Sequence, residues 1–261
     1  MNRVAIVTGA ARGIGAATVD VLVNEGYRVV AVDRCRDIPE VPYALATPGD
    51  LDAIVTRHGD LVLGLVGDVR SATDMQLAVE TATRHFGRLD AVVACAGVVA
   101  GGAPLWEVSD AAWDAVWSVN VLGTRRLIEA AAPTLIANGP DANGRIVAVA
   151  SAAGRLGLLH LAAYSAAKHA VVGLIRGAAM DFAPHGVTVN AISPGSTRTA
   201  ILDASAALYG LASPEEFAQH QPIGRLLEPM EVASCIAWLC SPAASAITGA
   251  DVAVDGGMTV G

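Results

Sequence analysis

Two side chains four positions apart could exchange a proton with a substrate. Tyr164 and Lys168 lie in an apolar stretch of small residues that is typical of a helix, where residues four apart share one face. Lys168 is the only lysine among the 17 lysines and arginines of the chain. The compact ammonium of a lysine can lie beside a phenol and lower its pKa. The guanidinium group of an arginine is larger, planar and permanently charged. The pair predicts a tyrosine that acts as a general acid or base.

A serine is expected to join this pair at the edge of a sheet. Ser151 lies thirteen residues before Tyr164 and follows the apolar run 144–150, which is typical of a buried strand. Ligands bind outside the carboxyl ends of the strands in open α/β sheets. Alone, Tyr164 could be a packed aromatic residue and Ser151 a strand-end cap. At this combined spacing they predict a site that binds the oxygen of an alcohol or a carbonyl.

The first residues form a pattern that favours a nucleotide. The apolar segment 3–8 leads into a loop with glycines at Gly9, Gly13 and Gly15, and then into a helical stretch. Glycines permit a tight turn and close approach of the backbone, and the helix N-terminus offers free N–H groups to a pyrophosphate. Strand, glycine loop and helix in this order predict a dinucleotide site.

An acidic residue at the end of the next apolar run selects the nucleotide. Asp33 follows Gly15 by eighteen residues. A carboxylate there accepts hydrogen bonds from the adenosine ribose and repels a 2′-phosphate, so we expect NAD rather than NADP. Arg12 and Arg34 flank the same region and could bind a phosphate. Asp33 carries more weight because its charge would lie against the 2′ position itself.

Taken together, these residues resemble the short-chain dehydrogenase/reductase family. The resemblance covers essentially the whole chain and is carried by Thr8, Gly9, Gly13, Gly15, Asn120, Ser151, Tyr164 and Lys168, with Asp255-Gly256-Gly257 near the end. It implies that Tyr164 is the acid/base and that Ser151 hydrogen-bonds the reacting oxygen. It also implies that Lys168 holds the nicotinamide ribose and that Asn120 lets water relay protons to this lysine.

The resemblance also implies a set of cofactor contacts. Asp68-Val69 would contact adenine, and the segment from Pro194 to Thr199 would bind the nicotinamide amide. The predicted catalytic residues are Asn120, Ser151, Tyr164 and Lys168, and no metal ligands are expected. The predicted cofactor-binding residues are Gly9, Arg12, Gly13, Ile14, Gly15, Asp33, Arg34, Asp68, Val69, Ala96, Gly97, Tyr164, Lys168, Pro194, Gly195, Thr197 and Thr199.

Two departures from the family pattern stand out. The family's Asn-Asn-Ala-Gly is here Ala94-Cys95-Ala96-Gly97. The bracing amides are lost and cysteine is a weak hydrogen-bonding group, which affects local rigidity more than activity. The second departure is a proline-containing insertion, about 35–46, directly after Asp33. It resembles mycofactocin-associated members of the family, in which the insertion covers a tightly bound NAD that a peptide-derived redox cofactor recycles. The alternative is an ordinary surface loop.

The apolar segments alternate between strand-like and helix-like patterns. We expect strands near 3–8, 28–32, 61–66, 90–95, 145–150, 187–192 and 251–254, and helices near 13–25, 49–58, 72–86, 111–137, 161–183 and 228–240. This alternation predicts one α/β domain, 1–261, with a doubly wound, Rossmann-type parallel sheet of about seven strands and helices on both faces. The one irregular stretch, about 200–227, is predicted to be a substrate lid.

Composition and charge exclude several classes of partner. Hydrophobic residues make up 53% of the chain without an apolar run that could span a bilayer, as expected for a buried parallel sheet. A net charge of −8 argues against nucleic acid or an anionic membrane as partner. The four cysteines lack metal-ligand spacing and the chain enters a strand at once, so we expect reduced thiols, no signal peptide and a cytoplasmic protein. The family resemblance implies a homotetramer.

Three functions stay open at this point. The first is an NAD-dependent oxidoreductase that acts on a secondary alcohol or ketone. Leucines before the tyrosine helix and apolar residues in the lid favour a hydrophobic small-molecule substrate, although Arg198 could bind an anionic one. The second is a ketoacyl thioester reductase of the same fold, against which Asp33 and the net charge argue. The third is a non-catalytic nucleotide-binding member, which the intact Ser151, Tyr164 and Lys168 disfavour.

Overall fold

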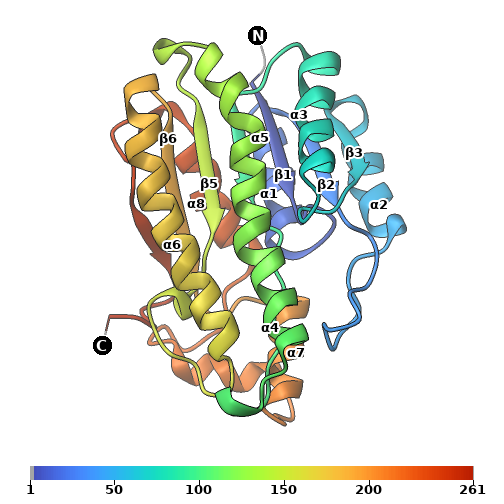
Figure 1. Ribbon diagram of the computed structural model, residues 1–261, viewed down its shortest axis with the longest axis vertical. Helices are drawn as coiled ribbons and strands as arrows, with labels where there is room; N and C mark the ends of the chain where they lie inside the picture. Colours follow the sequence, from blue (N-terminus) through green and yellow to red (C-terminus); the bar gives the residue numbers. More distant parts are fainter. Residues whose placement is uncertain (1–2, 261) are drawn as a thin grey trace.

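A single parallel sheet forms the centre of the molecule. The computed structural model describes residues 3–260, and its seven strands lie in the order β3-β2-β1-β4-β5-β6-β7 (Figure 1). The strands are β1 (Val4–Thr8), β2 (Arg28–Asp33), β3 (Val62–Val66), β4 (Ala91–Ala94), β5 (Arg145–Val149), β6 (Thr188–Pro194) and β7 (Asp251–Val254). Every neighbouring pair is parallel. The predicted single-domain doubly wound fold is confirmed.

Helices cover both faces of this sheet. They are α1 (Gly13–Asn24), α2 (Pro48–His58), α3 (Ala72–Phe86), α4 (Asp110–Trp117), α5 (Gly123–Ala137), α6 (Ala162–Phe182), α7 (Ala200–Leu208) and α8 (Pro229–Cys240). One layer of the core joins α3, α5 and α6 to the sheet, on the side nearer the viewer in Figure 1. The other layer joins α1, α2 and α8 to it. Because both faces are covered, central strands such as β1 and β6 are buried at every residue.

The order of the strands creates a crevice. The chain winds outward from β1 to β3 and then returns to the other side of β1 as β4. Loops that follow β1 and β4 therefore lead to opposite faces, and ligands of such sheets bind at this switch point, outside the carboxyl ends of the strands. Asp33, Ser151 and Pro194 lie at or directly after the ends of β2, β5 and β6, so they share this edge.

Two predicted segments differ from the structure. The predicted helix 111–137 is interrupted by a π-helical turn at Ser118–Leu122, which joins α4 to α5. Asn120 lies in this turn and uses its own side chain to bind backbone carbonyls. The predicted irregular stretch 200–227 is partly helical, since it contains α7 and a 3-10 turn at Pro214–His220. Its apolar residues pack on one another, with Leu202, Phe217 and Leu226 at the centre.

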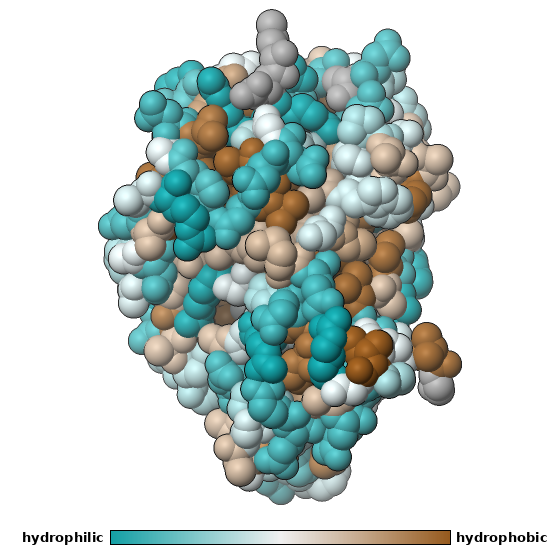
Figure 2. Space-filling view, turned by 180° about the vertical axis from the view of Figure 1, so that it is seen from behind, coloured by the Kyte–Doolittle hydropathy of each residue, from teal (hydrophilic) through white to brown (hydrophobic). Residues whose placement is uncertain are grey.

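The surface is mixed rather than uniformly polar. On the side hidden in Figure 1, apolar side chains are scattered among hydrophilic ones (Figure 2). No helix within residues 3–260 is both long and apolar enough to cross a bilayer.

Candidate active site

A cavity of about 900 Å³ lies at the carboxyl edge of the sheet. It is lined by residues that follow each of the strands β1 to β6 and by residues of α6 and α7. Every predicted cofactor-binding residue lines it: Gly9, Arg12, Gly13, Ile14, Gly15, Asp33, Arg34, Asp68, Val69, Ala96, Gly97, Tyr164, Lys168, Pro194, Gly195, Thr197 and Thr199. Ser151 lines it as well, whereas Asn120 is buried behind its wall. The fold thus brings together residues that are up to 190 positions apart in the sequence.

The glycine loop packs closely against the segment after β4 and against its own backbone. A Cβ atom on Gly9 would lie 2.8 Å from the Cα of Ala96, and one on Gly15 would lie 1.9 Å from the carbonyl oxygen of Gly9. Gly9 and Gly13 also have positive φ angles, +64° and +59°. The N-cap residue of α1, Arg12, makes no side-chain capping bond, so the first N–H groups of α1 stay available to an anion. This loop fits the pyrophosphate of a dinucleotide.

Asp33 is held in place at the far end of the cavity. Its carboxylate accepts hydrogen bonds from the backbone N–H groups of Ala11 (3.1 Å) and Cys35 (3.2 Å). These bonds join the glycine loop to the first residue of the insertion. They leave further lone pairs of the carboxylate free, because each ionised oxygen can accept more than one bond. The position suits the ribose hydroxyls that the sequence predicted for it.

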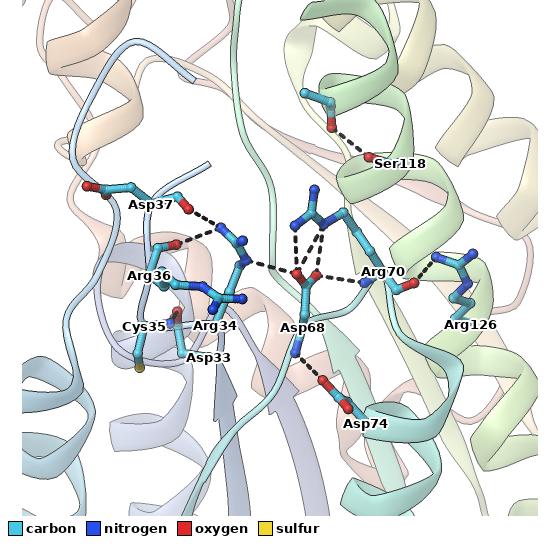
Figure 3. Close-up of polar contacts among 11 residues, drawn as sticks. Asp33, Arg34, Cys35, Arg36, Asp37, Asp68, Arg70, Asp74, Ser118 and Arg126 are labelled. Carbon is cyan, nitrogen blue, oxygen red and sulfur yellow. Dashed lines mark hydrogen bonds and ion pairs between the residues drawn. The ribbon is translucent and has the colours of Figure 1, made fainter. Parts of the chain in front are cut away.

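The two arginines beside Asp33 are engaged with the insertion. Arg34 Nε lies 2.8 Å from Asp68 Oδ2, and its Nη1 donates to the carbonyl oxygens of Arg36 (2.8 Å) and Asp37 (Figure 3). Arg12 Nη2 donates to the carbonyl oxygen of Ala44 at 2.9 Å. Both guanidinium groups therefore stabilise the 35–46 loop. This arrangement supports the choice of Asp33 over the arginines as the residue that distinguishes NAD from NADP.

The predicted catalytic side chains meet in the middle of the cavity. Ser151, Tyr164 and Lys168 line the cavity together, and Tyr164 lies one turn of α6 before Lys168. Lys168 Nζ lies 5.6 Å from the centroid of the Tyr164 ring and donates to the carbonyl oxygen of Val149 at 2.8 Å. The serine and the tyrosine thus offer two hydroxyl groups to one substrate oxygen, which is the arrangement that general acid–base chemistry needs.

Burial shifts the pKa of both titratable groups. Desolvation raises the pKa of Tyr164 to about 12, although the hydrogen bond with Ser151 acts in the opposite direction. Desolvation lowers the pKa of Lys168 to about 8. Lys168 is not among the groups that shift the pKa of Tyr164 in the protein alone, and the lowering expected from it stays a prediction.

Asn120 and Lys168 both lie next to Gly97. Its Nδ2 donates to the carbonyl oxygens of Val98 (2.9 Å) and Val116 (2.8 Å), while its buried Oδ1 has no partner among the described residues. A Cβ on Gly97 would lie 2.9 Å from this Oδ1 and 3.4 Å from Lys168 Nζ. The acceptor and the ammonium thus face the same gap beside Gly97. A water there would have two polar partners, as a proton relay requires.

Thr8 partly replaces the asparagines missing after β4. Its Oγ1 accepts from the backbone N–H of Ala96 (3.4 Å) and reaches the carbonyl oxygen of Val93 (3.5 Å). Cys95 is mostly surrounded by protein, and burial raises the pKa of its thiol to about 12, so it stays neutral. The loss of rigidity expected from Cys95 is offset by this bridge between β1 and β4.

The substrate end of the cavity is mainly apolar. Its lining includes Leu156, Leu158, Leu159, Leu161, Ile201, Leu202, Leu211, Phe217 and Met258. The sequence analysis missed the polar residues Ser205, Gln219 and His220, because nothing in the local pattern shows which lid residues face inward. Arg198 does not line the cavity and pairs with Glu215 and Glu228 (Nε–Oε1, 2.8 Å). Its expected role toward an anionic substrate is not supported.

Comparisons with known proteins agree with this geometry. A family profile described as enoyl-(acyl carrier protein) reductase matches residues 9–259. Cis-4-hydroxycyclohexanecarboxylate dehydrogenase of Sinomonas cyclohexanicum is 39% identical over 99% of this chain and 97% of its own length. The chain belongs to the short-chain dehydrogenase/reductase family.

Solved structures show the same fold. A carveol dehydrogenase of Mycobacterium avium in complex with NAD superposes with a TM-score of 0.93 at 28% identity, covering 99% of this chain and 98% of that one. A 3-ketoacyl-(acyl-carrier-protein) reductase of Brucella melitensis complexed with NADH has a TM-score of 0.87 at 30% identity, covering 98% of each chain.

The position of Asp33 yields a prediction about the nucleotide. Asp33→Asn keeps a hydrogen-bonding side chain but removes the charge, so it should weaken NAD by about 10- to 100-fold, the scale of a charge-assisted hydrogen bond. It should also narrow the preference for NAD over NADP, because the repulsion of a 2′-phosphate is lost. Titration of both nucleotides by calorimetry checks this. A wild-type protein that prefers NADP would overturn the assignment.

Proposed function

We propose that this protein is an NAD-dependent oxidoreductase that transfers a hydride between the nicotinamide and a hydrophobic secondary alcohol or ketone. The observation that carries the proposal is that Ser151 and Tyr164 line one cavity together with the glycine loop and Asp33. The NAD complex of the similar carveol dehydrogenase supports the cofactor. The roles of the individual residues follow from their positions.

In this mechanism the two hydroxyl groups act on one oxygen. Bound NAD supplies the hydride acceptor for alcohol oxidation. Ser151 hydrogen-bonds the substrate oxygen and orients it, and Tyr164 accepts the hydroxyl proton as general base. In the reverse direction Tyr164 donates the proton to the carbonyl oxygen. Because burial alone raises the pKa of Tyr164, the positive charge of the oxidised nicotinamide must contribute to the lowering that base catalysis needs.

Lys168 and Asn120 serve the proton path. Lys168 is positioned by the Val149 carbonyl, so its ammonium can also hold the nicotinamide ribose. The unpartnered Oδ1 of Asn120 and the Lys168 ammonium can bind one water between them beside Gly97. That water would connect the buried lysine to solvent and replace the proton that Tyr164 exchanges.

The lining of the cavity supports a hydrophobic class of substrate. Leucines from the segment before α6 face apolar residues of the lid, and the cationic lining residues other than Lys168 lie at the nucleotide end. A neutral cyclic secondary alcohol fits such a lining better than a sugar or a carboxylate. The relatives named above act on carveol and on a hydroxycyclohexanecarboxylate, which supports an alcohol on a six-membered ring. Because the second of these substrates is a carboxylate, the preference for a neutral substrate rests on the apolar lining alone.

A ketoacyl thioester reductase is the second candidate. The Brucella melitensis reductase favours it, and because that protein is complexed with NADH, Asp33 does not exclude this activity. The net charge of −8 still argues against docking of an acidic carrier protein. A non-catalytic role is disfavoured because Ser151, Tyr164 and Lys168 line one cavity.

The insertion is proposed to cover the adenosine half of the site, as in the mycofactocin-associated subgroup. Its Ile38 and Val41 are buried in the main core, and arginines hold its backbone from two sides. Such a loop would slow the release of NAD, which a peptide-derived redox cofactor would then recycle in place. We further propose a cytoplasmic homotetramer, in keeping with the family resemblance.

Removal of the phenolic hydroxyl tests the proton transfer. Tyr164→Phe should reduce turnover of a cyclic alcohol by roughly 10²–10⁴, the range of a lost general acid/base, with NAD binding nearly unchanged. Tyr27→Phe is the matched control, because Tyr27 precedes β2 at the opposite edge of the sheet and donates to the Cys240 carbonyl (2.8 Å). Steady-state and single-turnover rates check this. Equal rates for Tyr164→Phe and wild type would refute the role.

The insertion can be loosened without deleting its buried residues. Asp37 Oδ1 accepts from the backbone N–H of Leu45 at 2.7 Å and so closes the loop. Asp37→Ala should raise the NADH dissociation rate by about tenfold, because affinity differences between related complexes lie mostly in the off-rate. Asp52→Ala removes an exposed carboxylate from α2 and is the control. Stopped-flow displacement of NADH decides it, and identical off-rates for the two variants would leave the insertion an ordinary surface loop.

A further inference from the structure

One residue of the insertion reaches the apolar cluster beside the substrate end of the cavity. Tyr43 is half-buried, and its hydroxyl accepts a hydrogen bond from the backbone N–H of Val99 at 3.2 Å. Tyr43 packs against the main core and also belongs to the apolar cluster around Val99 and Leu161, which includes Tyr164. An insertion that starts beside the adenosine ribose position therefore extends to the catalytic tyrosine.

The segment that Tyr43 holds is the loop after β4, residues 95–100. Thr8 binds this loop at Ala96, and Asn120 binds it at Val98. The Tyr43 hydroxyl adds a third support at Val99, which is completely buried. Between these supports lies Gly97, whose backbone faces Lys168 and Asn120. A displacement of this loop would therefore move the residues on which the proposed chemistry depends.

Tyr43 and Tyr164 pack against the same apolar cluster. The Tyr164 pKa is raised mainly by burial, and the proximity of Tyr43 adds to the rise. Burial raises the pKa of Tyr43 as well, so both phenols are neutral in the protein alone. The cluster that contains them includes Leu158, Ile201 and Tyr209, which line the substrate end of the cavity. The ring of Tyr43 thus packs against the same cluster as residues of the wall that a substrate would touch.

We propose that Tyr43 is a positioning and specificity-determining residue, whose hydroxyl holds the 95–100 loop and whose ring supports the substrate wall beside Tyr164. This inference rests on the proposed oxidoreductase function. It gives the insertion a second role, because a cover over the adenosine half needs no contact with Val99. If Tyr43 had a purely structural role, its substitution would lower the stability of the protein. It would change neither hydrogen exchange in the 95–100 loop nor the choice of substrate.

The hydroxyl and the ring can be tested separately. Tyr43→Phe leaves the buried Val99 N–H without its partner while it keeps the ring. Amide hydrogen exchange in 95–100 should become faster, and the rate at which the NAD-loaded protein forms NADH from cyclohexanol should fall by about 2- to 10-fold, as for one lost neutral hydrogen bond. Tyr27→Phe, the matched loss of a buried hydroxyl, should change neither quantity.

Tyr43→Ala tests the substrate wall. It opens space behind Leu158 and Ile201, so the specificity ratio for menthol over cyclohexanol should rise by about tenfold, on the scale of hydrophobic pocket changes. Hydrogen exchange needs no alcohol, so it reports on the loop even when neither alcohol is a substrate of the wild type. Exchange in 95–100 that is equal in Tyr43→Phe and Tyr27→Phe overturns the positioning role. An unchanged substrate ratio in Tyr43→Ala overturns the specificity role.

Discussion

A buried ammonium is the constraint around which this site is arranged. Lys168 is 4% exposed, and desolvation of an ion costs several kcal/mol unless polar partners compensate for it. The structure supplies one partner directly in the Val149 carbonyl and places the free oxygen of Asn120 across a gap that only a glycine leaves open. The low pKa of Lys168 shows that the compensation is incomplete. A side chain in this state responds strongly to any charge or water placed next to it.

Loops around the cavity are tied to one another by arginines. Arg34 joins the end of β2 to Asp68 after β3, and Arg155 joins the segment after β5 to Asp251 of β7. Arg198 joins Glu215 of the lid to Glu228 at the start of α8. Each of these guanidinium groups makes more than one contact, which a lysine ammonium could not do with the same geometry. The nearly complete use of arginine elsewhere in the chain therefore has a structural reason, separate from the chemical reason for the single lysine.

Most of the fold could be predicted because its strands are buried on both faces. Continuous apolar runs such as 3–8 mark the strands to within a residue or two, and polar residues at their ends mark the edge where a ligand binds. Contacts between distant segments could not be predicted. Nothing near Tyr43 in the sequence indicates Val99 as its partner, and nothing near Arg34 shows that the insertion would occupy its guanidinium group. The helix α7 was missed because its face is set by the lid core rather than by a clear period.

The π-helical turn at Ser118–Leu122 has a consequence for the whole helix that contains it. Such a turn accommodates one residue more than an α-helical turn, and each residue of an α-helix advances the side-chain direction by about 100°. The extra residue therefore sets the rotational phase between α4, which faces the substrate-side cluster with Val116, and α5, which faces the sheet with Leu127. A chain one residue shorter at this point could form a regular helix, but it could not direct Val116 toward its cluster and Leu127 toward the sheet at the same time. The number of residues in this turn thus fixes how α4 and α5 are rotated relative to each other.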